Sequence, residues 1–208
     1  MRPTDGSSSR CDSRVLRCLA ALACAATPLA AQWSLGAEIG LLACRGGASD
    51  TATSGTPNTL RPSQGATYAL RVQRSFGTFG AGMSFLYSST GVGAENEETT
   101  VEAKSSMELL ELAPEAFVVL ARPGAGGAVL LHAGILLDHW SLQTDGRDRV
   151  AALAAVSLDW PMTGRWSGTF RAGLAVGPSV FDEEEMPDGF KRHATWRRSI
   201  AAGVQLRL

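Results

Sequence analysis

From residue 32 to the end of the chain, apolar side chains alternate with polar or small ones at a period of two. Successive side chains of a β-strand point to opposite faces, so this period predicts strands with one apolar and one polar face. No stretch between the alternating segments has the longer period of a helix. The pattern therefore predicts an all-β fold with eight strands, at about 32–43, 65–75, 79–89, 107–120, 128–141, 149–160, 165–177 and 194–208.

The predicted strands are longer than those of most soluble sheets. Each has more than ten residues, whereas strands in soluble proteins typically have about five or six. A tilted strand needs roughly 9–11 residues to cross the hydrocarbon layer of a membrane. The lengths therefore favour membrane-crossing strands or a large soluble barrel.

The connections between the segments alternate in length. Long connections fall at about 44–63, 90–105 and 178–193, with a shorter one at 142–148, and tight ones fall at 76–78, 122–127 and 161–164. Outer-membrane barrels combine long outer loops with short periplasmic turns, and an even strand number returns both ends to the short-turn side. We expect an eight-stranded antiparallel up-and-down transmembrane β-barrel over residues 32–208.

Aromatic residues on the apolar face fall at two levels. Trp33, Phe79, Trp160 and Trp166 lie near the short turns, and Tyr68, Tyr87 and Trp196 lie near the long connections. Two aromatic belts flanking an apolar band are typical of a membrane-spanning barrel.

The opposite face carries charges that a small barrel must enclose. An eight-stranded barrel has room for side chains and little else, and buried charges need partners. Acids and bases are nearly balanced on this face, which predicts a structural polar plug made of Glu38, Arg71, Glu111, Glu115, Asp138, Asp159, Arg171, Arg197 and Arg207.

The first 31 residues have the features of a secretory signal peptide. Basic residues such as Arg2 and Arg17 precede the apolar stretch from Cys18 to Ala26, and small residues follow at 30–31. A lipoprotein signal acylated at Cys24 is a weaker alternative. We expect residues 1–31 to be removed on export to the outer membrane, which leaves Cys44 as a single thiol without a disulfide partner or an evident role.

The exported part resembles the small outer-membrane β-barrel proteins, a group that includes the OmpA transmembrane domain, OmpX and OmpW. The last strand resembles the barrel-assembly signal, with apolar residues at every second position from Ile200 to Leu208, although the usual terminal aromatic is replaced by Leu208. The resemblance implies outer-membrane lipid, lipopolysaccharide and the barrel-assembly machinery as partners. It implies no single activity, because such barrels include adhesins, conduits, anchors and lipid-modifying enzymes.

The favoured function is a structural or surface-interaction barrel, and three alternatives remain open. One is a narrow conduit for small apolar molecules. Another is a soluble lipocalin-like binding barrel, in which the apolar face would point inward. The third is a lipid A-modifying hydrolase in which His139 would activate Ser141, oriented by Asp145 or Asp148.

Other chemistry finds little support in the sequence. The acidic run Asp182–Glu185 could attract a divalent cation but lacks the ligand spacing of a calcium loop, and His132 and His193 are far apart in the chain. A net charge of −1 gives no basic footprint for nucleic acid. We therefore predict no enzyme activity, catalytic residue, cofactor or metal, and the sequence leaves the oligomeric state open.

Overall fold

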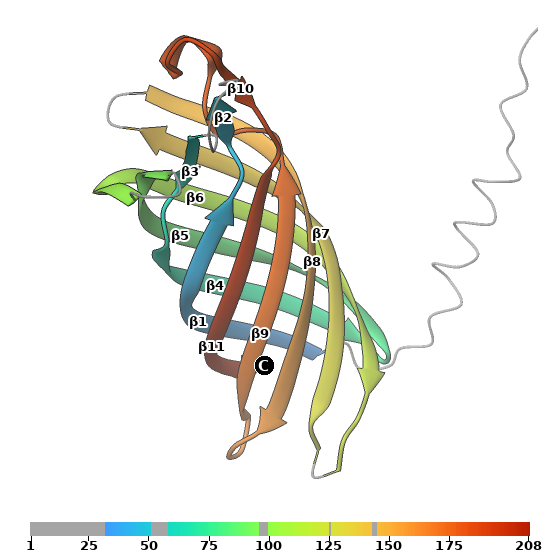
Figure 1. Ribbon diagram of the computed structural model, residues 1–208. Helices are drawn as coiled ribbons and strands as arrows, with labels where there is room; N and C mark the ends of the chain where they lie inside the picture. The colour runs from blue at the N-terminus through green and yellow to red at the C-terminus, as the bar shows by residue number, and fades with distance from the viewer. Residues whose placement is uncertain (1–31, 51–57, 96–99, 125, 143–144) are drawn as a thin grey trace, which may run out of the picture. The chain divides into compact units, whose positions relative to one another are not determined.

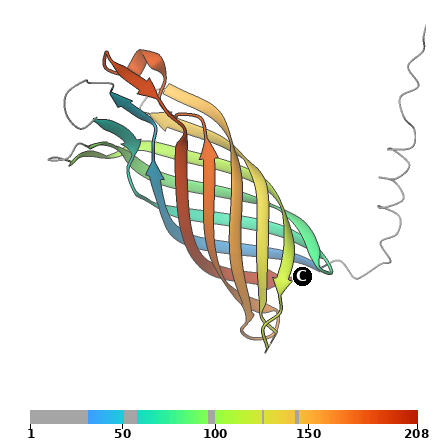
Figure 2. The same cartoon turned by 45° about the vertical axis from the view of Figure 1, so that its right-hand side comes forward.

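The computed structural model describes residues 32–50, 58–95, 100–124, 126–142 and 145–208 (Figure 1). Eight antiparallel strands form a ring that closes where the last strand pairs with the first (Figure 2). In ring order they are β1 (Gln32–Arg45), β4 (Gly65–Phe76), β5 (Phe79–Glu95), β6 (Thr100–Ala121), β7 (Ala128–Leu142), β8 (Asp145–Pro161), β9 (Trp166–Gly177) and β11 (Thr195–Arg207). The predicted eight-stranded antiparallel barrel is confirmed.

The long connections contain more regular structure than the sequence predicts. Short strands β2 (Ala48–Asp50), β3 (Thr59–Pro62) and β10 (Phe190–Arg192) form a small sheet that continues from β5, and Glu183–Glu185 form a 3₁₀ turn, η1. β5 and β6 also extend their pairing into the expected loop at 90–105, as far as Glu95 opposite Thr100. These strands escape prediction because they lie beyond the ring and their residues lack the two-faced alternation that ring strands show.

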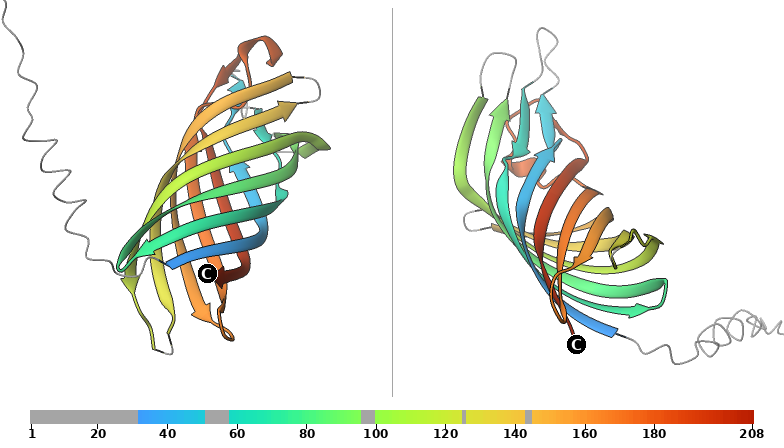
Figure 3. Two further views of the ribbon diagram at one scale, coloured as in Figure 1. Left: turned by 180° about the vertical axis from the view of Figure 1, so that it is seen from behind. Right: turned by 90° about the horizontal axis from the view of Figure 1, so that it is seen from below.

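At the opposite end the strands join by tight turns (Figure 3). Gly77 and Thr78 alone connect β4 to β5, and Gly77 has a φ of +81°, which glycine adopts without steric cost. Phe76 and Phe79 pair across this turn and their rings stack with centroids 5.7 Å apart. Gly164, with a φ of +56°, lies in the turn between β8 and β9.

The apolar face of each strand points away from the barrel interior. Ile39, Leu70 and Val150 are more than half exposed, whereas Glu38, Arg71 and Arg171 are buried inside. This arrangement contradicts the soluble lipocalin-like alternative, which required an apolar interior and a charged exterior. The strands expose a continuous apolar surface that a bilayer can cover.

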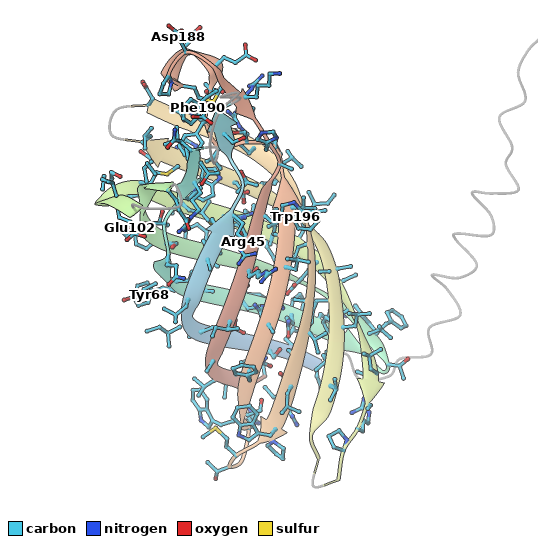
Figure 4. All side chains as sticks on the ribbon, in the orientation of Figure 1. Arg45, Tyr68, Glu102, Asp188, Phe190 and Trp196 are labelled. Atoms are coloured by element: carbon cyan, nitrogen blue, oxygen red, sulfur yellow. The ribbon has the colours of Figure 1, made fainter. Side chains whose placement is uncertain are left out.

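The aromatic residues of the two predicted belts lie on this exterior. Trp33, Phe79, Trp160 and Trp166 are exposed near the tight turns, and Tyr68 and Trp196 are exposed nearer the long connections (Figure 4). Tyr87 is half-buried.

No helix among the described residues is long and apolar enough to cross a membrane. The predicted signal peptide at 1–31 lies outside the described residues.

Candidate functional site

Four charged side chains inside the barrel form one connected group, the inner ion-pair cluster: Glu38, Arg71, Glu115 and Arg171. Arg71 on β4 donates to both carboxylate oxygens of Glu38 on β1, at 2.6 and 3.0 Å. Arg171 on β9 donates to Glu115 on β6 at 2.5 Å. The Nε atom of Arg71 lies 3.3 Å from Glu115, so the cluster links strands from opposite parts of the ring.

Glycines beside these charges make room for them. A Cβ atom on Gly203 would lie 2.7 Å from the Cγ of Glu38, and one on Gly134 would lie 3.0 Å from the Cβ of Glu115. Both Cβ positions would also lie within 2.5 Å of a backbone oxygen of the neighbouring strand, so a larger residue would shift the strand as well as the acidic side chain. These two glycines therefore allow the strands and the charges to pack closely.

His132 on β7 completes this cluster. Its Nδ1 atom lies 3.6 Å from a Glu115 oxygen, and its Nε2 atom is hydrogen-bonded to the Ser157 hydroxyl at 2.9 Å. The ring of Phe117 packs against the imidazole. Strand alternation already put His132 on the inward face, but nothing in the sequence indicated its partners.

A second group, the outer ion-pair cluster, lies further toward the long connections. Arg197 on β11 donates to Glu111 on β6 at 3.0 Å and to Asp138 on β7 at 2.7 Å. The Arg197 guanidinium also lies over the ring of Trp140, 5.7 Å from its centroid. This position is favourable for a cation because the face of an aromatic ring carries negative partial charge.

One residue of the predicted charged set departs from it: Arg207 is exposed at the end of β11. Asp159 is half-buried on the inward face and accepts a hydrogen bond from the buried Thr169 at 2.7 Å. The other seven residues of the set are buried.

A cavity of about 40 Å³ lies between the two ion-pair clusters. Its lining includes Glu38, Arg71, Glu111 and Arg171. This cavity therefore has room for a few water molecules among the charged side chains.

The outer end of the interior is apolar, which the sequence analysis did not predict. Its buried members, here called the mouth cluster, are Leu42, Cys44, Ala48, Met107, Leu109, Trp140, Val180 and Phe181. Val180 and Phe181 come from the connection after β9, which folds back into the barrel mouth. The Cys44 thiol packs among apolar side chains here.

Hydrogen bonds hold this connection over the mouth. Together β2, β3 and the connection at 178–193, which contains η1 and β10, form a cap at the upper end of the barrel in Figure 1. Arg147 donates to the Val180 carbonyl at 2.9 Å, and the Ser179 hydroxyl donates to the Gly47 carbonyl at 2.7 Å. The carbonyl groups of Val180 and Gly47 thus have partners although they are buried.

The acidic run at 182–185 contributes to the cap through ion pairs. Asp182 accepts from Arg149 at 2.6 Å and lies 3.2 Å from Arg147, and Glu183 accepts from Arg192 at 2.8 Å. Within the described part of the chain, no group of three or more His, Cys, Asp or Glu side chains could hold a metal ion.

The hypothesised hydrolase residues lie at the outer end of the β7–β8 hairpin. The Nδ1 atom of His139 is 2.8 Å from the Asp148 carboxylate, and both side chains are exposed on the exterior. Ser141 lies opposite Gly146, and the Nε2 atom of His139 is 3.1 Å from where a Gly146 Cβ would be. Asp145 pairs instead with Leu142 in the strand register.

No protein-family model matches this chain, and no curated protein matches it. Solved structures do match. The outer membrane protein OprG from Pseudomonas aeruginosa aligns with a TM-score of 0.59 and 8% identity, over 86% of this chain and 96% of that chain. Neisserial surface protein A aligns with a TM-score of 0.52 and 12% identity, over 85% of this chain and 97% of that chain.

This chain has the fold of the small outer-membrane β-barrels. The predicted resemblance is therefore confirmed at the level of architecture. At such low sequence identity, the structural similarity does not show that this chain shares the activity of either protein. Within this fold, the chain has two ion-pair clusters, a mouth cluster and a cap above it.

Proposed function

We propose that this protein is an outer-membrane barrel with a structural or surface-interaction role, closed to solutes and carrying a folded cap toward the cell exterior. The observation that carries the proposal is the filling of the interior. Ion pairs cross the barrel at two levels, and the mouth cluster lies above them. A barrel whose interior is filled in this way serves to anchor the cap in the membrane and to present it at the cell surface.

The apolar exterior and the shared fold support a location in the outer membrane. Lipid, including lipopolysaccharide, is then the immediate partner of the exterior. Export by a signal peptide at 1–31 and insertion by the barrel-assembly machinery belong to the same proposal.

Single-channel recording in planar bilayers tests the closed interior. We expect no conductance steps from protein whose folding has been checked by its migration on unboiled gels. Reproducible steps from the folded wild-type protein would contradict the proposal and favour the narrow conduit. An uptake assay with small apolar solutes in cells would then identify what passes.

One observation favours a second candidate, a lipid A-modifying hydrolase. The contact between His139 and Asp148 orients the imidazole as a serine hydrolase requires, with Nε2 left for the nucleophile. Ser141 would attack the ester carbonyl while His139 accepts its proton and returns it to the departing alkoxide. Water would then release the acyl chain as a fatty acid and restore Ser141.

Mass spectrometry of lipid A from expressing cells tests this second candidate. Loss of one acyl chain should occur with the wild type and should disappear in Ser141→Ala and His139→Ala. His193→Ala, which removes an exposed histidine of the cap, serves as the control and should behave as wild type. Lipid A that is unchanged in cells expressing the wild type rules out the hydrolase.

A further inference from the structure

A hollow of about 460 Å³ lies on the barrel exterior across β7, β8, β9 and β11. Small residues on β8 and β9 form its floor. Ala154 and Ala172 face outward, whereas Ala155 and Gly173, at inward-facing positions, contribute their backbone. Larger apolar side chains surround them, among them Leu131, Val156 and Ile200. The exterior is therefore indented where neighbouring parts of the barrel present larger side chains.

One charged side chain borders this apolar hollow. Arg198 on β11 is exposed and lies in register with Leu174, whereas Ile200, two residues nearer the tight turns, lies in register with Ala172. Arg198 therefore lies at the end of the hollow that is nearer the cap. An arginine on a lipid-facing surface is costly at the bilayer centre and tolerated near the interface, where polar partners are within reach.

Arg45 provides a second guanidinium beside the first. It pairs with Trp196, and Ala43 pairs with Arg198, so Arg45 and Arg198 are diagonal neighbours on one face of β1 and β11. Diagonal neighbours are roughly 7–8 Å apart, within reach of long side chains. Figure 4 shows Arg45 and Trp196 close together on the outer surface.

Neither arginine has an acidic partner in the described part of the chain. The ion pairs there involve other arginines, including Arg71, Arg171 and Arg197 inside the barrel and Arg147, Arg149 and Arg192 at the cap. Two unpaired guanidinium groups can bind a phosphate through several charge-assisted hydrogen bonds. Their position above an apolar hollow matches a ligand with a phosphate head and an acyl chain.

We infer that this surface holds one lipid A molecule of the outer leaflet, with a phosphate between Arg45 and Arg198 and an acyl chain in the hollow. The inference rests on the proposed membrane location, with the cap facing outward. It goes further by assigning a specific bound lipid to a defined part of the barrel surface. Trp196 would pack beside the sugar head group at the membrane interface.

Native mass spectrometry tests the site. The folded protein is expressed from the full-length sequence and purified in detergent, and purified lipid A is the probe. We expect the wild type to retain one lipid A molecule. The variant Arg45→Ala/Arg198→Ala should bind it at least about tenfold more weakly, because it loses the charge-assisted hydrogen bonds. Lipid A stripped of its phosphates should bind the wild type with a similar loss.

A second variant tests the hollow without changing charge. Ala172→Phe places a ring in the hollow and should also weaken lipid A binding by at least about tenfold. Two controls should bind as wild type: Arg165→Ala removes an exposed arginine near the tight turns, and Ala202→Phe adds a ring to the exterior outside the hollow.

The inference is overturned if the double arginine variant binds lipid A as the wild type does. It is also overturned if phosphatidylglycerol binds as tightly as lipid A, since the surface would then attract any anionic lipid. Every variant is first checked for outer-membrane recovery and for faster migration when unboiled. Failure of the wild type in that check contradicts the proposed function, whereas a folded, membrane-inserted wild type without retained lipid A contradicts this inference alone.

Discussion

Arg71 is the residue that joins the two halves of the inner ion-pair cluster. It contacts Glu38 on a neighbouring strand and Glu115 on a strand further round the ring. All three side chains are buried, so each charge depends on the others for compensation. Removing one member of such a group leaves an uncompensated charge, which costs more than the group itself contributes to stability.

We predict that Arg71→Met lowers the free energy of unfolding by about 3–5 kcal/mol, because Glu38 loses its partner. Urea titration in detergent micelles measures the change. Arg165→Met, at an exposed turn, should stay within about 0.5 kcal/mol of the wild type. Arg71→Met combined with Glu38→Gln should recover part of the loss, since Glu115 and Arg171 then remain as a balanced pair. Equal stability of Arg71→Met and Arg165→Met would contradict this account.

Sequence alternation was enough to predict which residues face inward but not what they contact. It assigned Glu38, Arg71 and Arg197 to the interior, where the structure has them. The partner of each charge depends on strand stagger around the ring, which a single strand does not encode. Trp140 follows the same alternation, because its position between His139 and Ser141 places it in the interior, although it is apolar.

At the scale of elements, the cap depends on a short segment after β9. Val180 and Phe181 enter the mouth cluster, and the backbone around them is held by Ser179, Arg147 and Arg149. The ring strands were predictable because their two faces meet two different environments. The cap was not, because its order comes from tertiary contacts between segments far apart in the sequence.

We predict that Phe181→Ala releases the cap while leaving the ring intact. Truncation of a buried phenylalanine costs about 3–5 kcal/mol, and here the loss falls on the contacts that hold the connection. Limited proteolysis should therefore cleave within 178–193 more rapidly than in the wild type, with the unboiled gel shift retained. Asp188→Ala, at an exposed position of the cap, should be cleaved at the wild-type rate. Identical cleavage of the two variants would show that Phe181 does not secure the cap.

At the scale of the whole molecule, the proposed membrane location implies an orientation. Because outer-membrane barrels have their long loops outside, we expect the cap to face the cell exterior and the tight turns to face the periplasm. Cys44 is buried, so it should give little background in a thiol-labelling experiment.

We predict that Asp188→Cys reacts with a membrane-impermeant maleimide on intact cells, because this part of the cap is exposed. Gly124→Cys, in the tight connection between β6 and β7, should react only after the cells are opened. If Gly124→Cys alone were labelled on intact cells, the opposite orientation would be correct. The wild type supplies the baseline in both conditions.

The central claim is that the apolar face of the barrel meets lipid in the outer membrane. Membrane fractionation followed by gel electrophoresis of unboiled and boiled samples tests it most directly. The account predicts recovery with the outer membrane and faster migration of the unboiled protein, as expected for a barrel that stays folded in SDS. Recovery as a soluble periplasmic protein whose migration does not change on boiling would contradict it.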